Sequence, residues 1–95
     1  MSYTNCSRKD GGYAVIGSMV VVNIRITADS NATNRIIYGF PTNPGSYTHI
    51  AMQALNASNN TSIPCVLDKN GIMTVINTTA NIDIIISGTY IAAIA

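Results

Sequence analysis

The sequence predicts an all-β protein: a small antiparallel β-sandwich of jelly-roll-like form with about seven short strands. β-Branched residues dominate the apolar runs and Glu is absent from the chain, so strands are favoured over helices. Turn signals separate the runs at intervals of about 8–12 residues, which is typical of sandwiches and small barrels.

The 95 residues are enough for one domain. Residues 1–11 are polar and unpatterned, and we expect them to form a leader or a linker to an upstream segment. Residues 12–95 carry the strand signals and are expected to form a single sandwich domain.

The first hairpin organises the rest of the chain. Residues 13–16 and 19–27 flank Gly17-Ser18, and a glycine followed by a small polar residue signals a two-residue turn. Along the second strand, alternate side chains point to opposite faces. One face begins apolar and ends polar, so the strand should finish with one side in water. The other face is wholly apolar and is expected in the core: Val20, Val22, Ile24 and Ile26.

Two short strands are expected in the middle of the chain. Residues 35–38 form the first, before a turn-dense segment in which Pro44-Gly45 suits a type II turn. Residues 47–55 alternate as a strand, although residues 51–55 would also suit a helix. Because a helix of that length is unstable without packing, we predict a strand.

A second hairpin joins residues 63–67 to residues 72–76 through Asp68-Lys69-Asn70-Gly71. Either Asn70 and Gly71 are both left-handed, or Gly71 alone forms a bulge after a type I turn, and the two choices differ in strand register. Pro64 cannot donate to a ladder, so its end of the strand should lie at an edge or a bulge. The turn residues predicted across the chain are Gly17, Gly45, Asn70 and Gly71.

The last strand is expected over residues 82–92. Its alternation separates an inner face from an outer face that still carries Ile85 and Ile91. The expected inner residues are Ile82, Ile84, Ile86, Gly88, Tyr90 and Ala92.

Low charge is the clearest compositional feature. Charged residues make up 9% of the chain, against about 25% in an average soluble domain. This favours an oligomer that hides apolar surface over a neutral monomer coated with Asn and Thr. The net charge of +1, without a basic block, argues against nucleic acid as a partner. The most apolar stretch, residues 82–95, is shorter than the roughly 20 residues of a membrane-spanning helix, so no membrane insertion is expected.

Nothing in the sequence indicates catalysis. His49 is the only side chain that titrates near neutrality, and a surface histidine is its simplest interpretation. Cys6 and Cys65 lack metal-ligand spacing, and Cys65 is expected to be free and buried. We therefore expect no enzyme activity, no metal and no cofactor. The four acids form no working pair: Asp10, Asp29, Asp68 and Asp83.

Binding chemistry is more plausible between residues 29 and 49, where aromatic and polar loop residues concentrate. Glycan sites combine aromatic faces with short polar groups in fixed loops. Tyr38 and Phe40 are better explained as core residues. Arg25 and Arg35 are either solvated or paired with Asp83 or Asp29. The ligand-binding candidates are Asp29, Arg35, Asn43, Tyr47 and His49.

Several segments in order carry a family resemblance. They are Tyr13 with residues 16–18 and 20–27, residues 36–41, residues 63–66 with 68–75, and residues 84–91. The stretches Ile16-Gly17-Ser18 and Asp68-Lys69-Asn70-Gly71 are among them. Together they resemble the C-terminal head domains of bacteriophage tail fibres and baseplate receptor-binding proteins. The absence of Trp departs from a typical sugar platform, and the family's variable binding loops provide no motif to carry over.

The resemblance implies a β-sandwich homotrimer at the virion tail tip, attached to an upstream fibre or baseplate protein. Such heads bind host cell-surface saccharides and mediate attachment. A structural tip without its own ligand is the alternative, and a polysaccharide depolymerase is disfavoured for want of paired acids. The expected trimer interface lies on the non-core faces of the two most apolar strands: Met19, Val21, Ile85 and Ile91.

Overall fold

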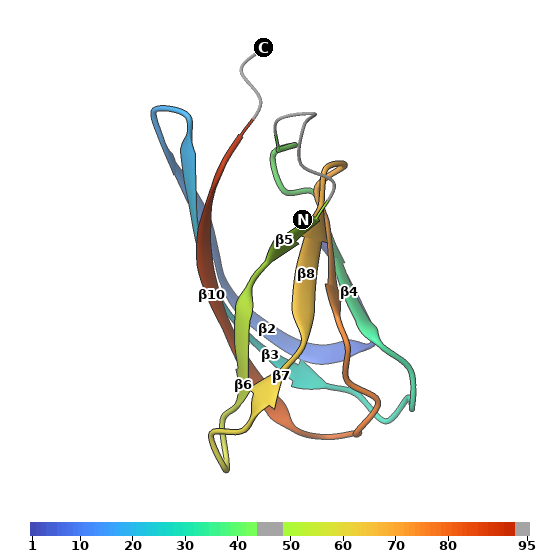
Figure 1. Cartoon of the computed structure of the whole chain (residues 1–95). Coiled ribbons are helices and arrows are strands. Elements are labelled where there is room, and N and C mark those ends of the chain that lie inside the picture. The colour runs from blue at the N-terminus through green and yellow to red at the C-terminus, as the bar shows by residue number, and fades with distance from the viewer. Residues whose placement is uncertain (44–48, 93–95) are drawn as a thin grey trace.

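The computed structural model describes residues 1–43 and 49–92, and these form an antiparallel β-sandwich, which confirms the predicted all-β fold (Figure 1). Two five-stranded sheets pack face to face, in the orders β1-β4-β9-β8-β5 and β2-β3-β10-β6-β7. The strands are β1 (Ser2–Thr4), β2 (Cys6–Ile16), β3 (Met19–Ala28), β4 (Arg35–Tyr38), β5 (His49–Ala51), β6 (Gln53–Asn56), β7 (Ser62–Ile63), β8 (Cys65–Asp68), β9 (Ile72–Val75) and β10 (Asp83–Ile91).

The chain passes from one sheet to the other at five places. At three of them a single residue divides the strands, which explains why the strands outnumber the expected seven. Asn5, with a φ of 64°, separates β1 from β2. Met52 interrupts the strand expected over residues 47–55, whose described part is extended rather than helical. Pro64 separates edge strand β7 from β8, at the kind of break that its missing N–H predicts.

The prediction that residues 1–11 are a leader or linker is wrong for the part of the segment that forms strands. β1 pairs with β4, and β2 pairs with β3 along the length of the hairpin. Tyr3 and Cys6 pack against the core, and Lys9 lies 5.1 Å from the centre of the Tyr3 ring. The segment was missed because edge strands are held by backbone pairing and need few apolar side chains.

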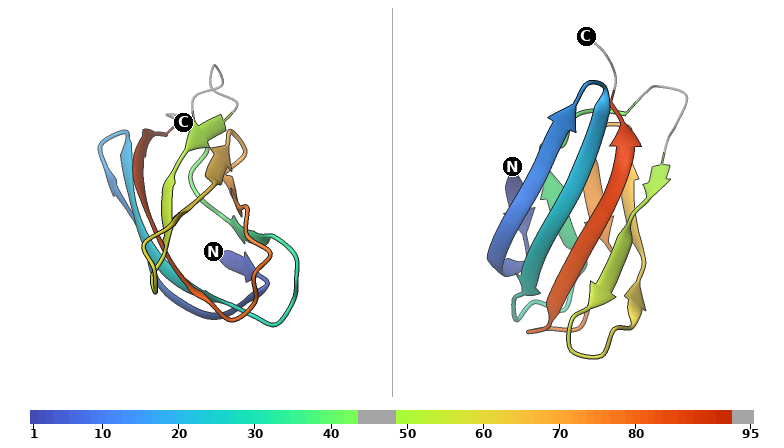
Figure 2. Two further views of the ribbon diagram at one scale, coloured as in Figure 1. Left: turned by 60° about the horizontal axis from the view of Figure 1, so that its bottom comes forward. Right: turned by 90° about the vertical axis from the view of Figure 1, so that its left-hand side faces the viewer.

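The core lies between the inner faces of the two sheets. The alternation predicted for β3 and β10 is confirmed, with Val20, Ile26, Ile84 and Ile86 each 0% exposed. β10 pairs with β3 on one side and β6 on the other, so it lies at the centre of its sheet (Figure 2). The two ends of this sheet are therefore joined through the buried inner face of the same central strand, β10.

Both hairpin turns can be compared with their predictions. Ile16 pairs with Met19 across Gly17-Ser18, which confirms the two-residue turn, and Gly17 supplies the positive φ of 62°. At the second turn Gly71 has a φ of 79° whereas Asn70 is not left-handed, so the bulge alternative is correct. The Asp68 carboxylate accepts hydrogen bonds from the Asn70 and Ile72 amides, at 2.9 and 3.1 Å. Gly45 lies outside the described residues.

Candidate functional site

An exposed apolar surface covers the end of the β2–β3 hairpin. Ile16 and Ile91 both pair with Met19, so the three side chains are neighbours on the outer face of the sheet. Their exposed fractions are 62%, 50% and 37% for Ile16, Ile91 and Met19. Val21 is half-buried two residues further along β3. We call Ile16, Met19, Val21 and Ile91 the hairpin patch.

The hairpin is apolar on its second face as well. Val15 pairs with the buried Val20 on the inner side of the sheet, yet it is 54% exposed and lies on β2, the edge strand of its sheet. Figure 1 shows this turn at the end of the sandwich opposite the β6–β7 loop. Two exposed apolar faces on one hairpin form a candidate surface for protein–protein contact.

Ile85, the fourth residue of the expected interface, lies away from this patch. It pairs with Arg25 on β3 and with Leu55 on β6. Ile91 lies six positions further along β10, a distance of about 20 Å at the usual rise per residue. The outer face therefore brings three of the four expected residues together and leaves Ile85 beside a different surface.

A groove of about 340 Å³ adjoins the hairpin patch between β5 and β10. Its lining is mainly apolar, and it shares Ile91 with the patch. The Tyr90 hydroxyl donates a 2.6 Å hydrogen bond to the Pro41 carbonyl, and burial raises the pKa of Tyr90 to about 12. This phenol is therefore a structural donor at neutral pH. The lining residues are His49, Ile50, Thr89, Tyr90 and Ile91.

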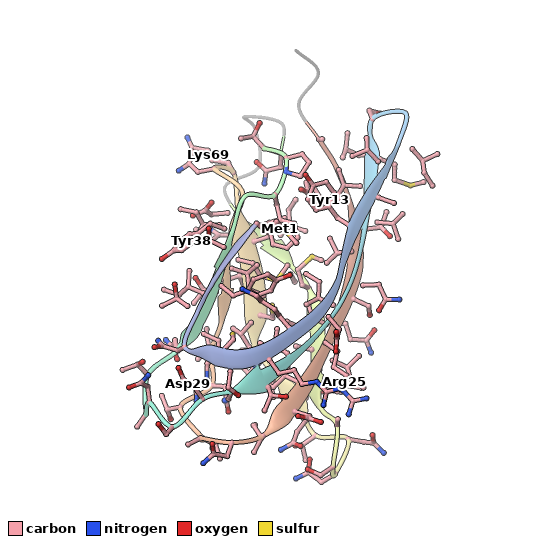
Figure 3. The ribbon with its side chains drawn as sticks, turned by 180° about the vertical axis from the view of Figure 1, so that it is seen from behind. Met1, Tyr13, Arg25, Asp29, Tyr38 and Lys69 are labelled. Atoms are coloured by element: carbon pink, nitrogen blue, oxygen red, sulfur yellow. The ribbon has the colours of Figure 1, made fainter. Side chains whose placement is uncertain are left out.

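A more polar cleft of about 430 Å³ lies at the other end of β10. β3 contributes one wall, and the β6–β7 loop and the start of β10 contribute the others. Figure 3 shows Arg25 towards this end of the molecule and Tyr13 towards the hairpin end. We call it the Arg25 cleft, and its lining residues are Arg25, Ala57, Ser58, Asn81, Ile82 and Asp83.

Local backbone bonding fixes the walls of the Arg25 cleft. The Ala57 amide donates to the Asp83 carbonyl at 2.9 Å, which attaches the β6–β7 loop to β10. The side chain of Asn56 accepts from the Ser58 amide at 3.0 Å and so forms an Asx turn. Asn81, with a φ of 59°, donates its amide to the Ala28 carbonyl at 3.1 Å. The short polar residues of these loops are therefore positioned by main-chain contacts.

An ion pair forms one side of the cleft. Arg25 Nη2 lies 2.8 Å from Asp83 Oδ2, and the Thr27 hydroxyl donates to Asp83 Oδ1 at 2.6 Å. The Thr27 hydrogen bond, together with Arg25, lowers the pKa of Asp83, so this carboxyl is ionised at neutral pH. The Arg25 side chain is 55% exposed and remains open to solvent.

Arg35, expected to contact a ligand, is instead a buried structural residue. It is 0% exposed, and its guanidinium donates to the carbonyls of Asn31 at 2.7 Å and Thr79 at 3.0 Å. A third contact reaches the Asp29 carboxylate at 3.4 Å. Arg35 alternates onto the same inner face as Ile37, and this periodicity is the signal that would have placed it inside. The Arg35 side chain therefore has no exposed surface in this structure with which to contact a ligand.

The five ligand-binding candidates do not converge on one site. Asp29 lies with Arg35 at the loop end, whereas His49 lines the groove at the hairpin end. Asn43 is 3% exposed, and its amide has no hydrogen-bond partner among the described residues. Tyr47 lies outside the described residues. The candidates were grouped by sequence proximity, but successive loops of an antiparallel sandwich alternate between its ends.

The Arg25 cleft was missed because its residues come from three distant segments. For these residues the sequence indicated one contact, the pairing of Arg25 with Asp83, as an alternative to a solvated Arg25. The structure confirms that pairing. Ser58 and Asn81 belong to loops whose composition indicates turns but no ligand. The contact between Ala57 and Asp83 depends on β6 lying beside β10. Sequence periodicity does not provide this order of strands.

Metal and thiol chemistry are not organised in the described residues. No cluster of His, Cys, Asp or Glu in residues 1–43 and 49–92 could hold a metal ion. Cys65 is free and buried, as expected, and burial raises the pKa of its thiol to about 12. No helix in the described part of the chain is long and apolar enough to cross a membrane.

Comparison with models of known protein families and with curated protein sequences finds no match for this chain.

Proposed function

We propose that this chain is the receptor-binding head domain of a bacteriophage tail fibre or baseplate arm. It assembles as a homotrimer at the virion tail tip, is carried by an upstream fibre or baseplate protein, and attaches to a saccharide on the host cell surface. The observation that supports this most is the separation of two surfaces along β10, an apolar one at the hairpin end and a polar cleft at the loop end.

The two-faced hairpin supports a ring of three rather than a pair. In a ring, each subunit contacts two neighbours through two different surfaces, whereas a two-fold dimer uses one self-complementary patch. Val15 is exposed on one face of the hairpin and Ile16 on the other. Each face can therefore meet a different neighbour, and the low charge of the chain agrees with surface hidden in an assembly.

The first test is the solution mass by light scattering on a sizing column. A mass three times the 10.0 kDa monomer supports the trimer, and a stable monomer contradicts it. Ile91→Lys should dissociate the trimer because it places a charge in the hairpin patch. The matched control is Ile76→Lys, because Ile76 is 49% exposed but lies outside the patch. Dissociation by both variants, or by neither, would contradict an interface at the hairpin.

Attachment is tested by binding of the fluorescently labelled domain to whole host bacteria. Binding that is competed by polysaccharide extracted from the same cells supports a saccharide receptor. A trimer that binds no host cells would indicate the purely structural tip instead. Release of reducing sugar from the extracted polysaccharide would indicate a depolymerase.

A further inference from the structure

We infer that the Arg25 cleft is the saccharide site, and that its ligand is a neutral, polyhydroxyl sugar rather than an acidic one. The inference rests on the proposed function for the class of ligand and goes beyond it in assigning the place and the charge. It is carried by the pairing of Arg25 with Asp83 inside an open cleft whose other lining residues combine the polar Ser58 and Asn81 with the apolar Ala57 and Ile82.

The balance of charge around the cleft favours a neutral ligand. Arg25 is matched by Asp83 at 2.8 Å, and Arg8 lies 3.6 Å from Asp10 on the adjoining strand. On the outer face of this end of the sheet, two cations are therefore matched by two anions, while Lys9 lies on the inner side beside the Tyr3 ring. An acidic sugar would approach an ionised Asp83 and could gain Arg25 only by competing with that carboxylate. A neutral sugar can contact both groups without separating them.

The hydrogen-bonding groups suit adjacent hydroxyls. Each oxygen of a carboxylate has two acceptor positions. The hydrogen bonds to Asp83 from Thr27 at Oδ1 and from Arg25 at Oδ2 occupy one position on each oxygen. Arg25 has five N–H groups on an exposed guanidinium, and its contact with Asp83 uses Nη2. A pair of vicinal hydroxyls can donate to Asp83 and accept from Arg25. Ser58 donates its hydroxyl to Asn56 at 2.8 Å and presents an oxygen that can accept.

Apolar side chains beside these groups supply the second part of a sugar site. Ile82 lines the cleft, and Ile85, which is 40% exposed, pairs directly with Arg25 on the outer face. Sugar rings present C–H surfaces that pack on apolar side chains while their hydroxyls bond at the edge. Ile85 lies too far from the hairpin patch to belong to that surface, and packing against a sugar ring gives its exposed side chain a role.

The cleft walls are held by the sheet, which reduces the entropy lost on binding. The Ala57 amide is bonded to β10, and the Asn81 amide is bonded to the Ala28 and Asp29 carbonyls. In a homotrimer the cleft would occur three times on one particle. Simultaneous contacts with a repeating polysaccharide would then raise the apparent affinity without any new contact in a single cleft.

The test is titration of the full ¹⁵N-labelled chain with glucose, galactose, N-acetylglucosamine and glucuronate, followed by amide chemical shifts. A neutral sugar should shift residues 57–58 and 81–83 together with Arg25, and leave residues 89–91 unchanged. Glucuronate should bind at least tenfold more weakly than glucose. Shifts confined to the groove at His49, tighter binding of glucuronate, or no shift with any of the four sugars would overturn the inference.

Variants connect the cleft to attachment. Asp83→Asn should weaken sugar binding at least tenfold, and Ser58→Ala about threefold, because each removes an acceptor. The matched control is Asp68→Asn, which makes the same change of charge in the β8–β9 turn, keeps an oxygen that accepts from the Asn70 and Ile72 amides, and should bind as the parent does. If Asp83→Asn is not folded by its amide spectrum, Arg25→Gln replaces it. Unchanged sugar binding by these folded variants would overturn the assignment.

Failure of this inference can be told apart from failure of the proposed function. If the parent protein binds host cells and Asp83→Asn binds them equally well, the cleft is not the site while the proposed function stands. If the parent protein itself binds no host cells, the proposed function fails irrespective of the variants. Loss of cell binding in Asp83→Asn, with retention in Asp68→Asn, supports both.

Discussion

The two ends of the β3–β10 ladder are built from the same two strands but present opposite chemistry. At the hairpin end, Met19 and Ile91 face outward as a pair and leave an apolar surface. At the loop end, Thr27 and Asp83 form the corresponding pair and carry charge and hydroxyl groups. At both ends the inner-facing residues of β3 and β10 are buried. An uninterrupted core thus allows one strand pair to carry both an assembly surface and a polar cleft.

The largest effect on stability is expected for a substitution in the buried core that the hairpin end and the loop end share. Ile86→Ala should lower the free energy of unfolding by about 2–5 kcal/mol, because Ile86 is 0% exposed at the centre of the sheet. Urea denaturation should show the hairpin end and the loop end melting together. The control is Ile85→Ala, the neighbour on the exposed face, which should cost less than about 1 kcal/mol. Separate melting of the two ends would show that the ladder does not couple them.

The next effect should be confined to the loop end. Arg35→Met removes the guanidinium that joins Asn31, Thr79 and Asp29, and should cost about 3 kcal/mol, the range found when one partner of a buried ion pair is lost. Amide exchange should increase in residues 29–34 and 79–81 and change little in residues 15–20. The control is Arg25→Met, whose exposed guanidinium should contribute much less. Equal increases at both ends would contradict a local role for Arg35.

Sequence periodicity predicted those features of the two ends that follow from the alternation of side chains along a strand. The buried faces of β3 and β10 follow from alternating β-branched residues, and Gly17-Ser18 specifies the turn that sets the hairpin register. Arg35 shows how a residue type can mislead. Arginine is usually exposed, but its alternation with Ile37 placed it inside, where carbonyls satisfy much of its guanidinium.

What the sequence could not provide is the arrangement of strands across the sheets. The Arg25 cleft depends on β6 lying beside β10 and on Ala57 bonding to Asp83. Strands distant in sequence become neighbours through the fold as a whole, and local composition carries little of that information. The same limit applies to β1 and the charged half of β2, which lack an apolar run and are held at sheet edges by backbone pairing.

A smaller effect is expected near the hairpin end. Tyr90→Phe removes the 2.6 Å hydrogen bond to the Pro41 carbonyl and should cost about 1 kcal/mol, since the ring still fills its place in the core. The measurement is thermal unfolding of both proteins at neutral pH. Sugar binding at the Arg25 cleft should be unaffected, because the substitution lies at the other end of β10. A change in sugar affinity with intact folding would show that the two ends are coupled.

The smallest effect is the acid titration of Asp83, and its sign follows from the direction of the pKa shift. The Thr27 and Arg25 hydrogen bonds lower the pKa of Asp83 below the ordinary value of 3.8. Its contribution to stability is therefore complete above that value and disappears as the pH falls through the pKa of the folded state. The difference in urea stability between the parent and Asp83→Asn should be constant from neutral pH down to about pH 5 and diminish in stronger acid. A difference that disappeared between pH 5 and 7 would mean that Asp83 titrates with a raised pKa. The Asp83 carboxylate would then be protonated at the pH at which it must accept hydrogen bonds from sugar hydroxyls. The proposed chemistry of the Arg25 cleft would lose its basis.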